Sequence, residues 1–147
     1  MKTRLGKKQK GAAAIEFALV FVIFFAVLYG VVSYSLPLLL VQSFNNATAE
    51  AVRRSMAVDP TAANYGGLVE TLAKNVLNEK LSWGPTAVKG SLVPAATYNA
   101  TTKVLTASVT LPATALTSIM PVLKLGIITV PNLPTSLKAE SSAQLVP

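Results

Sequence analysis

The sequence contains neither cysteine nor histidine among its 147 residues. Without cysteine the chain can form no disulfide, no thiolate nucleophile and no thiolate metal site. Without histidine it can form neither a Ser-His-Asp triad nor a histidine-bound metal. The five acidic residues after Glu16 show no spacing typical of paired acid/base or metal chemistry, and no pattern points to a Ser-Lys arrangement. We therefore expect neither an enzyme nor a cofactor.

Charged residues are also scarce, at 13% of the chain, against about 25% in an average soluble protein. Residues 17–41 contain no charge at all. A helix of that length rises roughly 37 Å, and about 20 residues suffice to cross a bilayer. We predict a transmembrane helix over residues 12–41; the alternative is the buried core helix of a soluble protein.

Basic residues are concentrated before the apolar run. Residues 11–147 hold eight Lys/Arg and six Asp/Glu, a net charge of +2, whereas the whole chain carries +7. The other basic residues are Lys2, Arg4, Lys7, Lys8 and Lys10. A basic flank followed by a span predicts a cytoplasmic N-terminus and an exported C-terminus, and the run is longer than the 7 to 15 apolar residues of a signal peptide. We therefore expect a single-pass protein of the inner (cytoplasmic) membrane with a periplasmic or extracellular C-terminal domain, and no nucleic-acid partner.

The predicted helix extends beyond the apolar run. Apolar and small residues continue at a 3-4-3-4 spacing, which marks one helical face, at Val41, Phe44, Thr48, Ala51 and Ser55. Glu50 and Arg54 form an acid-first i,i+4 pair on the other, solvated side. Asp59 precedes Pro60, and a residue before proline is disfavoured in a helix. We predict one helix over residues 12–58.

Pro37 lies inside this predicted helix. Proline removes one backbone hydrogen bond, and its ring crowds the carbonyl four residues earlier, here that of Ser33. We therefore predict a kink at Pro37 within the transmembrane helix. The hydroxyl of Ser33 or Ser35 is expected to bond the freed backbone groups.

The remainder of the chain indicates a small α+β domain. Residues 67–81 carry an apolar stripe at helical spacing. Residues 91–98 and 103–111 suit a β-hairpin, and the second alternates apolar and polar residues as in a sheet with one covered face. A proline-punctuated apolar loop over residues 112–134 is expected next, and then a third strand over residues 136–146.

Several finer expectations follow for this domain. Glu70 and Lys74 form an i,i+4 pair on the second helix, and Pro94 should confine the first strand to a sheet edge. Core positions are expected for the aromatic residues Phe44, Trp83 and Tyr98.

Residues 119–130 either line the core or meet a partner subunit or the membrane surface. The predicted parts are a leader over residues 1–11, the span over 12–41 and the exported domain over 42–147, whose sheet covers the exposed half of the first helix.

Glu16 is an acid at the start of the predicted span. A carboxylate at the centre of a membrane helix is unfavourable by about 2.5 to 3.5 kcal/mol, and less near the end. The positive end of the helix dipole offers partial compensation. Cleavage after Gly11 would offer more, because the new amine of Ala12 would lie one turn from Glu16 and on the same side.

The string Lys10-Gly11-Ala12-Ala13-Ala14-Ile15-Glu16-Phe17 resembles the cleavage motif of type IV prepilins. The resemblance implies that a membrane prepilin peptidase cuts between Gly11 and Ala12 and commonly methylates the new amine. It also implies that Glu16, followed by Phe17, acts in assembly by meeting the terminal amine of a neighbouring subunit.

The longer string from Gly11 to Val58 resembles the TadE-like family of tight-adherence (Flp, type IVb) pilus systems. Its shared features are an EFAL-type start, an apolar stretch, an amide-rich step at Asn45-Asn46 and an Ala-rich turn that contains Arg53-Arg54. Tyr34-Ser35-Leu36-Pro37 departs from the usual family pattern, which leaves the TadE-like and TadF-like subfamilies both open. The resemblance implies a pilin-like fold and, from the length of the chain, a minor pilin-like component, or pseudopilin.

The leading hypothesis is therefore a structural subunit that assists pilus assembly or secretion. Its expected partners are prepilin peptidase, other pilin or pseudopilin subunits, the inner-membrane assembly platform and membrane lipid. The alternative is an unprocessed bitopic inner-membrane scaffold of a secretion complex.

Overall fold

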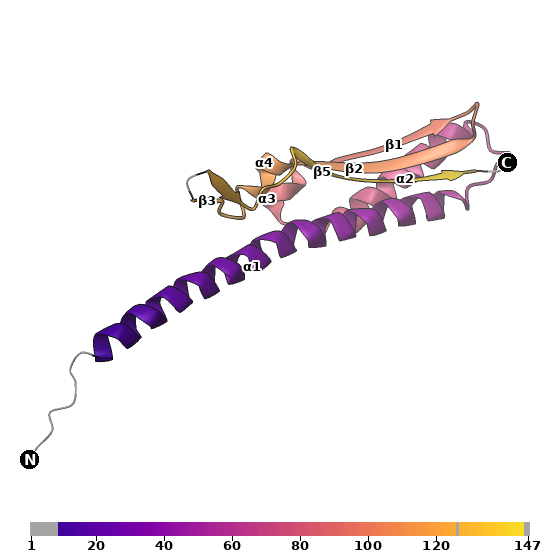
Figure 1. Ribbon diagram of the computed structural model, residues 1–147. Coiled ribbons are helices and arrows are strands. Elements are labelled where there is room, and N and C mark those ends of the chain that lie inside the picture. The colour runs from indigo at the N-terminus through magenta and orange to yellow at the C-terminus, as the bar shows by residue number, and fades with distance from the viewer. Residues whose placement is uncertain (1–8, 126, 146–147) are drawn as a thin grey trace, which may run out of the picture.

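The computed structural model describes residues 9–125 and 127–145, and its dominant element is helix α1 (Gln9–Ser55). Figure 1 shows α1 as one continuous, gently curved helix whose N-terminal half projects away from the rest of the chain. The predicted long helix is confirmed, with its ends displaced by three residues. Met56, Ala57 and Val58 donate backbone hydrogen bonds three residues back instead of four, which is the common tightening of a final helical turn.

A three-stranded antiparallel sheet faces the C-terminal half of α1. Its strands are β1 (Val93–Asn99), β2 (Val104–Pro112) and β5 (Ser136–Gln144), in the spatial order β1-β2-β5. The predicted hairpin and third strand are thus confirmed, and β1, which contains Pro94, is an edge strand as expected. Strand β2 is central, so it fixes the register of both neighbours.

The domain has two layers. Helix α2 (Tyr65–Leu81) lies beside α1, and both pack on one face of the sheet, α1 mainly under β5 and α2 mainly under β1. Alternate residues of β2 are fully buried on this face: Leu105, Ala107, Val109 and Leu111. The intervening residues of β2 are only partly buried. The predicted α+β plan, with a sheet covering half of the first helix, is confirmed.

The buried face of α1 is longer than the sequence pattern predicted. The predicted residues Phe44, Thr48, Ala51 and Ser55 are buried and Val41 is partly buried, while Ser33, Pro37 and Leu40 extend the face toward the N-terminus. Two buried residues of this face, Thr48 and Ser55, form hydrogen bonds to neighbouring elements. The Thr48 hydroxyl lies 2.9 Å from the Ser141 hydroxyl of β5, and the Ser55 hydroxyl donates to the Val69 carbonyl of α2.

Short regular elements occur outside the predicted helices and strands. One-turn helices α3 (Thr86–Lys89) and α4 (Ala113–Leu116) start directly after Pro85 and Pro112. A short hairpin, β3 (Leu123–Leu125) and β4 (Ile128–Val130), occupies the middle of the predicted loop over residues 112–134. Elements of three or four residues are too short to show a helical or strand periodicity.

The aromatic core prediction is right at two of three positions. Phe44 is 1% exposed, and Tyr98 is partly buried with its ring edge-to-face on Tyr65. Trp83 is 60% exposed. It follows the last residue of α2 in the turn that leads to Pro85, so the prediction of a core position for Trp83 is wrong.

Candidate functional site: the N-terminal half of helix α1

The first half of α1 is apolar, and residues 11–28 of this half, called the exposed rod, are not packed against the rest of the described chain. Every residue from Gly11 to Leu28 is exposed. Its large hydrophobic side chains include Ile15, Phe17, Phe21, Phe24, Phe25 and Leu28, each more than 40% exposed. Of the helices in the described ranges, α1 is the one long and apolar enough to cross a membrane. This helix fits a single-pass membrane protein.

Gly11 lies in the first turn of α1, where nothing in the fold requires glycine. A Cβ atom built on Gly11 would meet no heavy atom of another side chain or element within 4 Å. Glycine in a helix is less favourable than alanine by roughly 0.5 to 1 kcal/mol. The packing of the chain therefore gives no reason for glycine at this position, and a reason has to be sought elsewhere. The leader residues 1–8 lie outside the described residues.

Glu16 lies about two turns into α1, on its exposed surface. The first turn contains no acid, and the attraction of the helix dipole falls off beyond that turn. The dipole of the uncleaved helix therefore compensates Glu16 poorly. Ala12 precedes Glu16 by four residues within the same helix, so the two lie one above the other on one face.

Phe17 begins a stripe of aromatic rings beside Glu16. The ring centroids of Phe17 and Phe21 lie 5.8 Å apart and those of Phe21 and Phe25 4.4 Å apart, at successive i,i+4 positions. All three side chains are at least 47% exposed. Such a stripe is available to lipid or to the helix of another subunit.

The exposed rod ends where the C-terminal domain reaches α1. The Tyr29 hydroxyl donates to the Pro121 carbonyl, and the Tyr34 hydroxyl accepts a hydrogen bond from the Asn132 backbone N–H at 2.9 Å. Ser33, which lies between the two tyrosines in the sequence, is buried. The segment that carries β3 and β4 is therefore tied to α1 at residues 29–34, inside the range predicted to span the membrane.

Pro37 is buried at this junction, and α1 remains helical through it. The hydroxyls of Ser33 and Ser35 donate to the carbonyls of Gly30 and Val32. Neither of these bonds reaches the Ser33 carbonyl, which Pro37 leaves without its usual helical donor. The kink at Pro37 stays a prediction.

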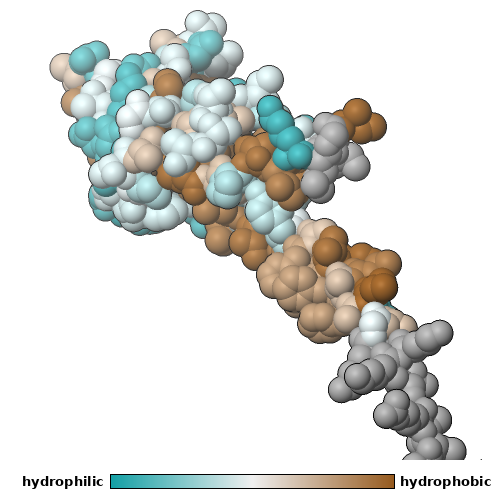
Figure 2. Space-filling view, turned by 90° about the vertical axis from the view of Figure 1, so that its left-hand side faces the viewer, coloured by the Kyte–Doolittle hydropathy of each residue, from teal (hydrophilic) through white to brown (hydrophobic). Residues whose placement is uncertain are grey.

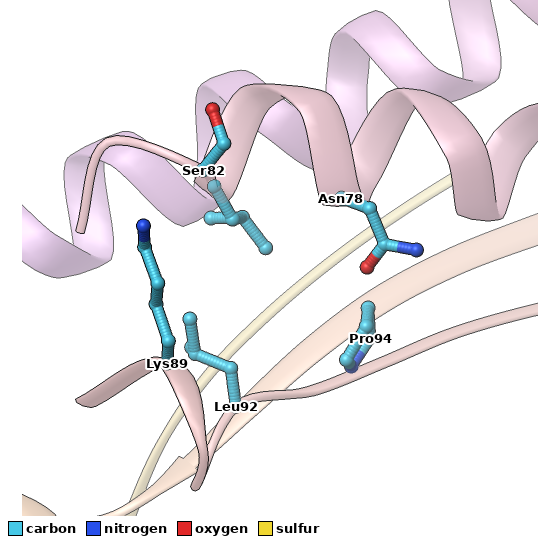
Figure 3. Close-up of a pocket in the computed structure, with 6 residues that line it drawn as sticks. Asn78, Ser82, Lys89, Leu92 and Pro94 are labelled. Atoms are coloured by element: carbon cyan, nitrogen blue, oxygen red, sulfur yellow. The ribbon is translucent and has the colours of Figure 1, made fainter. Parts of the chain in front are cut away.

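One hollow of the domain is lined by both a serine and a lysine, the residue types of a Ser-Lys arrangement. A cavity of about 190 Å³ lies between the end of α2 and the start of β1, and Figure 3 shows the side chains around it. Its lining residues are Asn78, Leu81, Ser82, Lys89, Leu92 and Pro94. Ser82 and Lys89 are both exposed, whereas an activated lysine needs desolvation or a cationic neighbour. Over residues 9–125 and 127–145, no cluster of three His, Cys, Asp or Glu is placed to hold a metal.

Comparison with known proteins matches one stretch of this helix. Residues 11–53 match the family described as TadE-like protein. This segment is similar to TadE-like proteins. The TadE-like family implies a component of tight-adherence pilus systems, and the resemblance read from the sequence is confirmed for these residues. No significant match was found among curated proteins or among solved structures.

The TadE-like segment lies entirely within α1 and joins two different environments. It starts at Gly11 in the exposed rod and ends at Arg53, in the part of α1 that packs under the sheet. The domain formed by α2 and the strands lies outside the match. The part of the chain that matches the family is therefore within its long helix.

An ion-pair cluster stands at the end of the TadE-like segment. Glu50 accepts hydrogen bonds from Arg53 at 2.7 Å and from Arg54 at 2.8 Å, and Arg54 also reaches Glu79 of α2 at 3.2 Å. The predicted Glu50–Arg54 pair is confirmed. The hydrogen bonds from Arg53 and then from Arg54 lower the pKa of Glu50 to about 2. The cluster links α1 to α2 at the surface, so its role is structural.

Proposed function

We propose that this protein is a minor pilin-like subunit, or pseudopilin, of a tight-adherence pilus system. The observation that carries the proposal is the TadE-like helix whose exposed half bears Gly11, Ala12 and Glu16 at the prepilin spacing. In this proposal α1 anchors the subunit in the inner membrane with its N-terminus in the cytoplasm. The C-terminal domain is exported and makes contacts in or beside the pilus.

Maturation is proposed to occur between Gly11 and Ala12, by a prepilin peptidase. Gly11 has no packing role in the fold, so selection by a peptidase gives a reason for glycine there. The bond lies in the first turn of α1. The N–H groups of a first turn have no intrahelical partner, so this turn opens more readily than the helix interior. Cleavage also removes the basic leader, whose lysines would otherwise oppose entry into the bilayer.

Assembly is proposed to depend on Glu16 and Phe17. The new amine of Ala12 is a cation one turn from Glu16, and in a bundle of parallel helices it can pair with Glu16 of its own chain or of a neighbouring subunit. Pairing between chains fixes their axial register because an offset leaves both charges unpaired in lipid. The exposed stripe that starts at Phe17 supplies apolar contact between helices. Other pilin or pseudopilin subunits, the inner-membrane assembly platform and lipid are the partners of this surface.

The proposed role is structural and involves no catalysis. Neither cysteine nor histidine occurs in the sequence, and the similarity of residues 11–53 to TadE-like proteins implies a structural pilus component. The competing function is an unprocessed membrane scaffold, which would use the same anchor and domain without cleavage.

Two substitutions test the proposal in cells that carry the pilus system. Gly11→Val is expected to block removal of the leader, seen as a longer chain on a gel. Gly30→Val is the matched control, because Gly30 is also a glycine of α1 with nothing within 4 Å of its Cβ position. Glu16→Ala is expected to leave cleavage intact and to impair pilus production. Normal pili in Glu16→Ala cells contradict the register role, and cleavage of Gly11→Val contradicts the proposed maturation.

A further inference from the structure

We infer that the β3–β4 hairpin, which carries the exposed residues Leu123, Lys124 and Ile127, rests on the phospholipid interface of the membrane that α1 crosses. The inference rests on the membrane-anchoring part of the proposed function, and it is independent of cleavage and of pilus assembly. It assigns the hairpin a partner of defined chemistry, a lipid surface, on the exported side.

The length of the exposed rod places the membrane boundary beside this hairpin. Residues 11–28 are exposed and helical, and eighteen residues rise about 27 Å, close to the roughly 30 Å of a hydrocarbon core. A span that starts at Gly11, directly after the basic leader, therefore ends near Leu28. Tyr29 and Tyr34 follow, and they bond the backbone of Pro121 and Asn132, which flank the hairpin. The hairpin is thus held at the level where the hydrocarbon ends.

The residues at that level suit an interface. Ile127 is fully exposed, and Leu123 is 39% exposed. Lys124 lies between them in sequence and is exposed, where its ammonium group can meet lipid phosphates. Tyrosines are enriched at membrane interfaces because their rings are apolar and their hydroxyls polar, and Tyr29 and Tyr34 fit this pattern.

The hairpin lies at the end of the domain that adjoins the anchor. Figure 1 shows β3 at the end of the domain from which α1 projects. In Figure 2 the brown hydrophobic surface runs from the projecting helix onto this end, whereas the opposite end of the domain is mostly teal and white. A bilayer that covers the helix would therefore also meet this end of the domain. An isoleucine as exposed as Ile127 is unfavourable in water and is accommodated by lipid.

Absence of cysteine makes a direct test possible. Single cysteines are placed by Ile127→Cys, Val22→Cys and Thr101→Cys, and each carries a small fluorophore. Ile127 and Thr101 are exposed, and Thr101 lies in the β1–β2 turn, so neither change disturbs packing. The full chain is reconstituted at one copy per nanodisc of phosphatidylcholine and phosphatidylglycerol. Some of the lipids carry a nitroxide quencher, either near the headgroup or deep in the acyl chain.

The headgroup-level quencher is expected to remove most of the fluorescence of the I127C probe and to leave the T101C probe unchanged. The deep quencher is expected to act most strongly on the V22C probe. Quenching at position 22 without quenching at position 127 overturns the inference and retains the membrane anchor. Failure to quench position 22 overturns the anchor and the inference together. A disulfide between two I127C chains that forms readily in multi-copy discs, with no lipid quenching in single-copy discs, assigns the surface to a second copy of the chain.

Discussion

The carboxylate of Glu70 accepts a hydrogen bond from the backbone N–H of Tyr98 at 2.8 Å. Glu70 belongs to α2 and Tyr98 to the edge strand β1, so the bond satisfies an N–H that has no neighbouring strand. The predicted ion pair between Glu70 and Lys74 is absent from the ion pairs of the described residues. The helical spacing was compatible with that pair, but a tertiary partner takes the carboxylate instead.

Replacement of Glu70 by alanine is therefore expected to destabilise the domain. Loss of a hydrogen bond to a charged group lowers the free energy of unfolding by about 1.5 to 3 kcal/mol. Lys74→Ala is the control and is expected to change the free energy of unfolding by less than about 0.5 kcal/mol, because Lys74 is exposed. Urea unfolding of the full chain in detergent, monitored by protease resistance, measures the free energy of unfolding of both variants. Equal losses of stability in the two variants would indicate that Glu70 pairs with Lys74 instead of with the Tyr98 N–H.

Phe44→Ala tests the packing of α1 under the sheet. Phe44 is 1% exposed, and removal of a buried phenylalanine ring typically lowers the free energy of unfolding by 3 to 5 kcal/mol. Phe24→Ala removes the same ring from the exposed rod, where Phe24 is 58% exposed. The same titration is expected to show a large loss for Phe44→Ala and no change in the domain for Phe24→Ala. A stable Phe44→Ala domain would mean that the sheet does not depend on α1.

The stability of the domain is expected to fall at acidic pH partly through Glu50. Its pKa is lowered from 4.5 to about 2 in the folded chain, so the unfolded chain binds the proton more readily. The contribution of Glu50 is therefore complete above pH 4.5 and is lost as the pH falls toward 2. In Glu50→Gln the free energy of unfolding should be lower at neutral pH and flatter over this window. Parallel pH profiles for the two proteins would show that Glu50 is not held by the arginines.

Tyr34→Phe probes the junction between α1 and the hairpin segment. The Tyr34 hydroxyl accepts from the Asn132 amide, so its removal should speed hydrogen exchange at Asn132 by up to about tenfold, the equivalent of 0.5 to 1.5 kcal/mol. Tyr29→Phe is the control, because Tyr29 bonds a carbonyl, that of Pro121, and protects no amide by that bond. Unchanged exchange at Asn132 in Tyr34→Phe would contradict the observed contact.

Helices and strands were predictable where the periodic pattern of apolar residues continues over many positions. Leu105 and Leu111 stand at alternate positions of a nine-residue strand, and both are buried. Thr48 and Ser55 were placed on the buried face by helical spacing alone. What escaped prediction depends on tertiary contacts. The sequence gives no sign that Asn132 bonds Tyr34. Trp83 was expected in the core only because it is aromatic, and it is exposed.

The candidate site was proposed from a local signal in the sequence, and its roles stay predictions. Gly11 and Glu16 are defined by spacing within one helix, which the family match over residues 11–53 includes. The end of the exposed rod was less predictable. Residues 29–41 are as free of charge as the preceding residues, and only the structure shows Ser33 and Pro37 covered by the domain.

Mass spectrometry of the protein extracted from membranes of pilus-producing cells shows directly whether the mature chain begins at Ala12. We expect an N-terminal peptide that starts at Ala12, with a free or methylated amine, and no peptide from residues 1–11. Cells without prepilin peptidase serve as the control and should retain those residues. A membrane-embedded chain that still carries residues 1–11 in peptidase-positive cells would rule out maturation after Gly11 and favour the unprocessed scaffold.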